Sequence, residues 1–187
     1  RPTRVASFGG RNSFLPHNMP KDNLDEFSKY NLFGWESKEN VFDSDADIVD
    51  HQVAIIEYEN GATLAFHTNM RVPDEFRRFA VIGTNGMVEG DFVRGYLKAH
   101  DQENNLVLDE DYGAAFGASK GHYGADNLML KDINQHLTNL EKINLPVGVK
   151  DCIESGIIAM KIDESRKTGK IVELTNTWQK LDLNMKN

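Results

Sequence analysis

Two Asn-Gly dipeptides, each set between runs of β-branched and aromatic residues, constrain the fold of this chain more than any other feature. HQVAIIEYENGATLAFHTN contains Asn60-Gly61, and EFRRFAVIGTNGMVEGDF contains Asn85-Gly86. Asn-Gly between such runs is the strongest short signal for a β-hairpin, because both residues accept the positive φ of a tight turn. GYLKAHDQENNLVLDED predicts a third pair of strands. We therefore expect an antiparallel meander of five or six strands over residues 50–110.

The spacing of apolar residues changes after this region from a strand period to a helix period. It predicts one helix from Ala125 and a second from Val149, the second ending at Gly169 as C-cap. Short strands are expected at Thr3–Phe8 and over KIVEL, and a short helix is possible near Asn23–Tyr30. The positions that define the two helix faces are Met129, Ile133, Leu137 and Leu140, then Ile153, Ile157 and Met160, with Cys152, Ala159 and Ile162 alongside.

Strands followed by two helices and a last strand predict an α+β fold, with an open, mainly antiparallel sheet and helices packed on one face. A length of 187 residues fits a single domain over residues 1–187. The strands at 51–58 and 62–69 carry apolar side chains on both faces, whereas a sheet covered on one side alternates apolar and polar residues. We therefore expect the second face to be an oligomer interface in a homodimer or higher homo-oligomer.

Composition excludes several classes of protein. The chain has 21 Lys and Arg against 29 Asp and Glu, a net charge of −8 without a basic run, so nucleic-acid binding is not expected. No apolar run approaches the roughly 20 residues of a membrane helix, so no membrane association is expected. The single cysteine, Cys152, excludes an internal disulfide and a Cys-rich zinc site. A reducing compartment, the cytoplasm, is the expected location.

Two motif-like stretches do not have the spacing of a binding site. DSDADIVDHQVA begins like a calcium loop, but Ile48 and Ala54 stand where such a loop needs Gly and Glu, so a solvated loop is expected. GAAFGASKGHYGAD lacks the phosphate-loop spacing, and Gly-x-Gly-x-x-Gly occurs nowhere in the chain. We expect no cofactor-binding and no metal-binding residues in this chain.

The best candidate site is at the start of the first predicted helix. His122 and Asp126 are four residues apart and would share a helix face, where they could meet as a hydrogen-bonded pair or as co-ligands. The alternative is structural: His122 precedes the helix, and Asp126 complements the positive end of the helix dipole.

Other polar residues are weaker candidates. His51 and His67 lie on adjoining predicted strands and could bind a metal, although a hydrogen-bonded structural histidine is the more common case. Arg71, Arg77 and Arg78 could hold an anionic substrate or pair with Glu57 and Glu59. Cys152 is expected on an apolar helix face, and the residues indicate no nucleophile beside a base. No catalytic residue is therefore assigned.

The order of four motifs resembles the C-terminal domain of the Gfo/Idh/MocA oxidoreductases, a family named after glucose–fructose oxidoreductase, inositol dehydrogenase and MocA. The segments are DADIVDHQVAIIEYENGATLAFHTNM, RRFAVIGTNGMVEGD, GHYGADNLMLKDI and LPVGVKDCIESGIIAMKIDESRKTGKIVEL. They place the resemblance over roughly residues 3–180. The family's Gly-His-x-Gly-x-Asp segment is matched by Gly121, His122, Gly124 and Asp126.

The resemblance implies a domain that follows an NAD(P)-binding Rossmann domain, forms a wall of the substrate cavity and makes the subunit contact through its sheet. The small-molecule substrate would be a sugar, polyol or related compound, oxidised or reduced by hydride transfer. His122, Tyr123 and Asp126 would bind this substrate. The cofactor, NAD or NADP, the catalytic lysine of the family's Glu-Lys-Pro segment and its Asp-x-x-x-His segment would lie before Arg1, so the isolated chain is expected to be inactive. The alternative is a non-catalytic, free-standing assembly or small-molecule-binding module.

Overall fold

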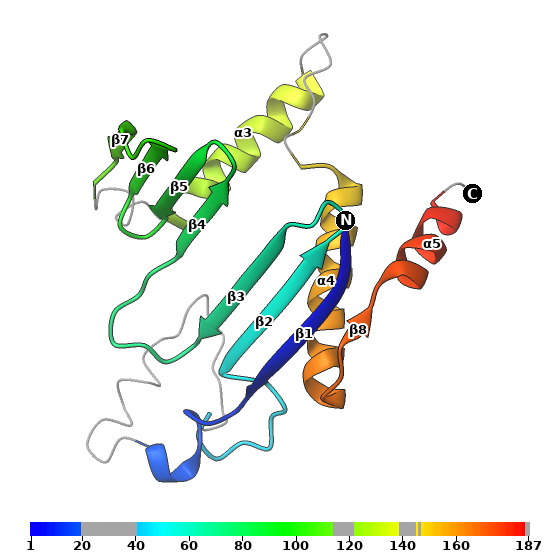
Figure 1. The fold of residues 1–187 in the computed structure, drawn as a ribbon. Coiled ribbons are helices and arrows are strands. Elements are labelled where there is room, and N and C mark those ends of the chain that lie inside the picture. The colour runs from blue at the N-terminus through cyan, green and yellow to red at the C-terminus, as the bar shows by residue number, and fades with distance from the viewer. Residues whose placement is uncertain (20–40, 114–121, 139–144, 146, 186–187) are drawn as a thin grey trace. The chain divides into compact units, whose positions relative to one another are not determined.

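The computed structural model describes residues 1–19, 41–113, 122–138, 145 and 147–185. These residues form two compact units, which are described separately (Figure 1). Unit 1 comprises Arg1–Arg71 and Val149–Asn187, and unit 2 comprises Val72–Gly148. The expected α+β class with antiparallel sheets is confirmed, and in the described residues each unit has an open sheet of four strands.

Sheet A of unit 1 is built from strands that lie far apart in the sequence. Its order is β3-β2-β1-β8, and every neighbouring pair is antiparallel. The elements of unit 1 are β1 (Pro2–Gly10), the 3₁₀ helix η1 (Pro16–Asn18), β2 (His51–Tyr58), β3 (Thr63–Asn69), α4 (Val149–Thr168), β8 (Val172–Glu173) and α5 (Thr175–Asn184).

The first Asn-Gly turn forms as predicted between β2 and β3. Gly61 has a φ of +81°, and its N–H donates to the Tyr58 carbonyl at 2.9 Å. The Asn60 side-chain oxygen accepts from the Ala62 N–H at 3.2 Å, a local bond typical of Asn in turns. The chemistry of these residues thus sets the register in which Ile56 faces Leu64.

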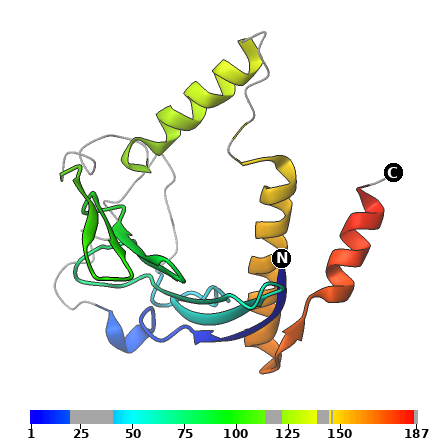
Figure 2. The same cartoon turned by 45° about the horizontal axis from the view of Figure 1, so that its top comes forward.

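The core of unit 1 lies between sheet A and α4. The buried core residues are Val5, Ile56, Val172, Leu174 and Trp178, and Tyr58, Ile157, Ile158, Ile162 and Leu181 pack against them. Figures 1 and 2 show α4 running along one side of the sheet. The bounds predicted for this helix are confirmed, and Gly169 caps it with a φ of +66°. The predicted face was wrong at Cys152, Ile153, Ala159 and Met160, which are exposed. The side of α4 that packs on the core instead carries Ile157, Ile158, Ile162 and the buried Ser165.

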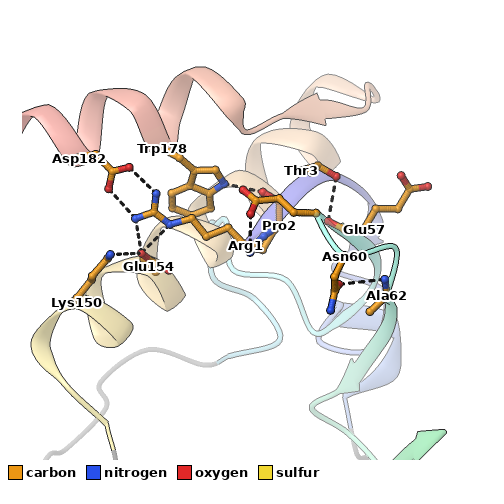
Figure 3. Close-up of polar contacts among 11 residues, drawn as sticks. Arg1, Pro2, Thr3, Glu57, Asn60, Ala62, Lys150, Glu154, Trp178 and Asp182 are labelled. Atoms are coloured by element: carbon orange, nitrogen blue, oxygen red, sulfur yellow. Dashed lines mark hydrogen bonds and ion pairs between the residues drawn. The ribbon is translucent and has the colours of Figure 1, made fainter. Parts of the chain in front are cut away.

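Helix α5 is an element that the sequence analysis did not predict. Trp178 is its buried anchor, and the Trp178 Nε1–H donates to the Pro2 carbonyl at 2.6 Å. The Arg1 guanidinium binds Glu154 of α4 and Asp182 of α5 and lies 5.4 Å from the centre of the Trp178 rings (Figure 3). These contacts join the start of β1 to both helices.

The buried Ser165 provides a hydrogen-bond acceptor for the edge of β1 beyond the end of β8. β8 pairs only with Arg4 and Val5, which leaves the next outward N–H of β1, that of Ser7, beyond its reach. The Ser7 N–H donates instead to Ser165 Oγ at 3.0 Å, and Ser165 Oγ–H donates to the Lys170 carbonyl at 2.6 Å. Helix α4 thus satisfies a backbone group that would otherwise be buried without a partner.

Sheet B of unit 2 is an antiparallel meander in the order β4-β5-β6-β7. The second hairpin turns at Thr84 and Asn85, one residue earlier than the predicted Asn85-Gly86 turn, because Gly86 is already the first residue of β5 and pairs with Gly83. A Cβ on Gly86 would lie 2.1 Å from the His100 carbonyl oxygen, so only glycine fits. The elements of unit 2 are β4 (Arg78–Gly83), β5 (Gly86–Asp91), β6 (Tyr96–Asp101), β7 (Leu106–Asp111), the 3₁₀ helix η3 (His122–Gly124) and α3 (Ala125–Thr138).

The predicted strands at residues 50–110 are all present, but their grouping differs from a single meander. β2 and β3 pair in sheet A, whereas β4 to β7 form sheet B. The break falls between Asn69 and Arg78, where Pro73 and a run of charged residues cannot continue a strand. The possible helix near Asn23–Tyr30 lies outside the described residues. None of the described helices is both long and apolar enough to cross a membrane.

Candidate functional site

The predicted pair of His122 and Asp126 is hydrogen-bonded. His122 Nδ1 lies 2.9 Å from Asp126 Oδ1 and 3.0 Å from Asp126 Oδ2. His122 is in η3, with a left-handed φ of +45°, and Asp126 is in the first turn of α3. Both side chains are open to solvent, with 71% of the His122 side chain and 46% of the Asp126 side chain exposed.

This geometry fixes the role of each ring nitrogen. An ionised carboxylate only accepts hydrogen bonds, so His122 Nδ1 carries the hydrogen. Nε2 then accepts a hydrogen bond when the imidazole is neutral and donates one when it is charged. Such a group can bind a hydroxyl group or exchange a proton with it. Gly121 and the side chain of Tyr123 lie outside what the structure describes.

Asp50 is a buried, hydrogen-bonded carboxylate directly before β2, and the sequence analysis missed it. It follows the exposed acids Asp43, Asp45 and Asp47 in the segment for which the sequence predicts a solvated loop. The structure shows instead that Asp50 is 1% exposed. Its carboxylate accepts hydrogen bonds from the backbone N–H groups of Asn12, Ser13 and Phe14 at 2.6 to 3.1 Å, and from His51 Nδ1 at 3.0 Å.

These contacts determine the charge of Asp50. Burial alone would raise its pKa, but the hydrogen bonds from His51 and from three backbone N–H groups outweigh burial and hold the pKa well below its usual range. Asp50 is therefore a carboxylate that joins the loop after β1 to the start of β2. No local motif marks it, because its three backbone partners lie 36 to 38 positions away in the sequence.

Arg11 organises the segment that resembles a calcium loop. Its guanidinium donates to the carbonyl groups of Val41, Ser44 and Ala46 at 2.6 to 3.0 Å. These carbonyls face a cation that the chain itself supplies, which supports the rejection of a calcium site. Within the described residues no three His, Cys, Asp or Glu side chains gather as metal ligands. The structural reading of His51 is confirmed by its bond to Asp50.

The three arginines of the sequence analysis belong to two units, and the contacts of each are described within its own unit. Arg71 donates to the carbonyls of Ser13 and Asn18 at 3.3 Å and stacks on Phe42 in unit 1. In unit 2, Arg77 lies 3.5 Å from Glu75, and Arg78 lies 3.5 Å from Asp91. The expected pairing with Glu57 and Glu59 was wrong, because Arg4 binds Glu57, and the Arg1 amino group lies 3.5 Å from Glu59.

One face of sheet B carries a shallow polar hollow. It is lined by Glu89, Tyr96, Lys98, Asp109 and Asp111. Lys98 Nζ lies 3.5 Å from Asp109 Oδ1, so neighbouring side chains already balance part of the acidic charge.

Comparisons with known proteins find relatives among oxidoreductases. No known family profile matches the sequence. The chain is 23% identical over 138 residues to a Bacillus subtilis protein named "Putative oxidoreductase YteT", a match that covers 66% of this chain and 30% of that protein.

Solved structures resemble the chain over almost its whole length. Levoglucosan dehydrogenase in complex with NADH and levoglucosan matches 94% of this chain with a TM-score of 0.62 and 13% identity. Aldose-aldose oxidoreductase from Caulobacter crescentus, in complex with glycerol, matches 93% with a TM-score of 0.57 and 18% identity. A Thermotoga maritima protein described as "putative oxidoreductase" matches 92% with a TM-score of 0.56 and 15% identity. The chain spans only 41 to 45% of these three proteins.

These matches define the class of fold. The chain has the fold of a domain found in oxidoreductases. More specifically, it has the fold of the C-terminal part of Gfo/Idh/MocA-type oxidoreductases, which confirms the resemblance seen in its motifs.

Proposed function

We propose that this chain is the C-terminal part of an NAD(P)-dependent oxidoreductase, in which it forms a wall of the substrate cavity and a contact between subunits. The observation that carries the proposal is the fold match over 92 to 94% of the chain to solved oxidoreductases, among them a dehydrogenase in complex with NADH. Because the chain spans less than half of those proteins, we assign cofactor binding and catalysis to a further domain of the enzyme. The lone cysteine favours a reducing compartment, the cytoplasm, for the whole enzyme.

The described residues of this chain do not fit the phosphates of a dinucleotide. The sequence has no Gly-x-Gly-x-x-Gly turn, and the carboxylate of Asp126 places a negative charge in the first turn of α3, where it would repel a phosphate. NAD or NADP would therefore bind the proposed Rossmann domain before Arg1. We therefore assign no part of the cofactor's chemistry to residues of this chain.

The His122–Asp126 pair is the proposed substrate contact, together with Tyr123. Asp126 keeps the hydrogen of His122 on Nδ1 and leaves Nε2 to face a ligand. One nitrogen that can accept or donate suits a hydroxyl group, which both donates and accepts, so a sugar or polyol is the proposed substrate class. The pair binds and orients the substrate, and the reacting groups belong to the rest of the enzyme.

The proposed subunit contact is the face of sheet A that α4 leaves uncovered. Phe8, Val53 and Ile55 are 72, 50 and 60% exposed there. Such a cluster of apolar side chains is typical of an interaction surface. A homodimer, or a higher homo-oligomer, is the simplest assembly that would cover it.

The test is an assay of the protein expressed with any coding sequence that precedes Arg1. We expect reduction of NAD or NADP with at least one member of a panel of aldoses, anhydrosugars and polyols, and no turnover by the 187-residue chain alone. An upstream sequence without a dinucleotide-binding turn, or an inactive complete protein that still binds sugars, would instead favour a free-standing assembly or binding module.

A further inference from the structure

The two outer strands of sheet B each have one open edge in the described part of the chain. The sheet ends at β4 on one side and at β7 on the other, and each of these strands pairs with a single neighbour (Figure 1). An open edge presents backbone N–H and C=O groups to which a further strand can bind. The residues along the two edges therefore decide what can pair there.

The outward backbone groups of β4 follow from its ladder with β5. Hydrogen bonds of an antiparallel pair fall on alternate residues of each strand. The Phe92 N–H donates to the Arg77 carbonyl at 3.1 Å, so the next residue, Arg78, and then Ala80 do not bond to β5. Arg78 and Ala80 therefore direct their N–H and C=O groups to the open edge.

The outward groups of β7 follow in the same way. The Tyr112 N–H donates to the Gly95 carbonyl at 2.6 Å, so the alternate residues Asp111 and Asp109 do not bond to β6. Their backbone groups point to the open edge of β7. Two acidic residues thus stand where an added strand would make its main-chain bonds.

The two edges have opposite charge at the ends that would meet. An antiparallel pair that sets Arg78 of one copy opposite Asp111 of another also sets Ala80 opposite Asp109. Sheet B already holds Arg78 and Asp111 in the same cross-strand row, so the added strand presents the same face as its neighbours. Arg78 is half exposed, and a guanidinium has several N–H donors, so it can keep its 3.5 Å contact with Asp91 and bind Asp111 as well.

Apolar side chains meet along the rest of the same register. Val81 falls opposite Leu108, and these residues are 64 and 36% exposed. Apolar residues directly opposite each other stabilise a strand pair. Pairing of β7 with a second β7 would instead set its acidic residues 109–111 against one another or against its apolar residues 106–108. The edge of β4 therefore suits β7 better than a second β7 does.

We propose that β4 of one copy of this chain pairs with β7 of a second copy, so that sheet B continues from one molecule into the next. The contact lies on sheet B and does not depend on the sheet A face of the proposed function. It joins two different edges, so each copy keeps one edge open and association does not stop at a dimer. The net charge of −8 opposes association in general, but at about 0.15 M salt charges are screened beyond about 8 Å, whereas Arg78 and Asp111 would be in contact.

Proline substitutions block one edge at a time. The Arg78–Asp111 and Ala80–Asp109 pairs would share about four backbone hydrogen bonds. Proline is tolerated in an edge strand where the N–H points outward, so Ala80→Pro and Asp109→Pro each remove one outward donor and keep the ladders within sheet B. Each change should lower the association constant at least about tenfold.

The experiment is sedimentation velocity over a range of protein concentrations, with circular dichroism as a check on folding. Every chain carries Val53→Asp, which removes the sheet A contact of the proposed function. The Val53→Asp parent should grow in average mass as its concentration rises, and each proline variant alone should stay monomeric. An equal mixture of the two should form 1:1 dimers and nothing larger, because one variant supplies an intact β7 and the other an intact β4.

Charge variants test the same edges if a proline variant unfolds. Ala80→Glu and Asp109→Lys each place like charges at the contact and should weaken it when alone, whereas a mixture restores opposite charges and should associate. Glu89→Lys is the matched control. It makes the same change of charge in the same row as Asp109→Lys but on β5, away from both edges, so it should associate like the parent.

The outcomes keep this contact apart from the proposed function. A Val53→Asp parent that is monomeric at every concentration overturns the edge contact, and leaves the sheet A contact to be judged from the chain without that substitution. Association that is unchanged in the folded proline or charge variants also overturns the edge contact. So does a mixture of two variants that associates no better than each variant alone.

Discussion

Replacing Asp50 with Asn is expected to destabilise unit 1 more than any other single charge removal in the segment 43–50. The three N–H bonds from residues 12–14 would change from bonds to a carboxylate into bonds to a neutral amide. A hydrogen bond to a charged group contributes about 1 kcal/mol more than a neutral one, so three of them give a loss of about 3 kcal/mol. The new amide N–H₂ also meets His51 Nδ1, which must change tautomer to accept it.

The pH dependence of this loss has a definite sign. The folded-state pKa of Asp50 is depressed, so the ionised form is the one that the fold stabilises. Its contribution is complete above the unfolded-state pKa of about 3.9 and is lost as pH falls below that value toward the folded-state pKa. The difference between wild type and Asp50→Asn should thus be constant from about pH 7 to about pH 5 and should narrow near about pH 3.5.

Urea unfolding followed by Trp178 fluorescence measures this difference directly. Trp178 is buried in the core of unit 1, and a Trp35→Phe background removes the second tryptophan signal. Asp47→Asn is the matched control, because Asp47 is exposed in the same segment and should change stability by less than about 0.5 kcal/mol. An Asp50→Asn variant as stable as this control at neutral pH, or a gap that persists unchanged in acid, would refute the account.

Three further substitutions test other contacts. Ser165→Ala should cost about 1 to 3 kcal/mol, because it leaves the Ser7 N–H and the Lys170 carbonyl without their partner, whereas the exposed Ser155→Ala should be near neutral in the same urea assay. Trp178→Phe should lose about 1 to 2 kcal/mol with its bond to the Pro2 carbonyl, measured by circular dichroism. In the complete enzyme, His122→Ala should lower kcat/KM roughly tenfold or more while cofactor affinity and folding stay unchanged. Unfolding of the domain with full activity of the folded fraction would make His122 structural.

Local chemistry explains which parts of the structure could be predicted from the sequence. The turn at Asn60-Gly61 and the helix that ends at Gly169 depend on residues within a few positions of one another, and both form as expected. The His122–Asp126 bond also joins residues only four positions apart, although His122 stands before α3 with a left-handed φ and does not share the helix face as predicted. Its contact with a substrate stays a proposal.

Long-range pairing explains what could not be predicted. Periodicity shows that β2 is a strand, but not that β1 pairs with it and leaves β4 to begin another sheet. Helix α5 has few apolar residues, and it is held by Arg1 and Pro2 at the opposite end of the sequence. Asp50 is one of several aspartates in the segment 43–50, and the sequence does not distinguish it from the exposed ones. Its burial depends on hydrogen bonds from residues 12–14, a loop that carries no recognisable motif.

The most direct test of the central claim is a calorimetric titration of NADH and NADPH into the complete protein and into the 187-residue chain. We expect binding by the complete protein with a dissociation constant in the micromolar range or below, and no measurable binding by this chain, which lacks a phosphate-binding turn. Micromolar binding by this chain alone, or a complete protein that binds neither dinucleotide, would contradict it.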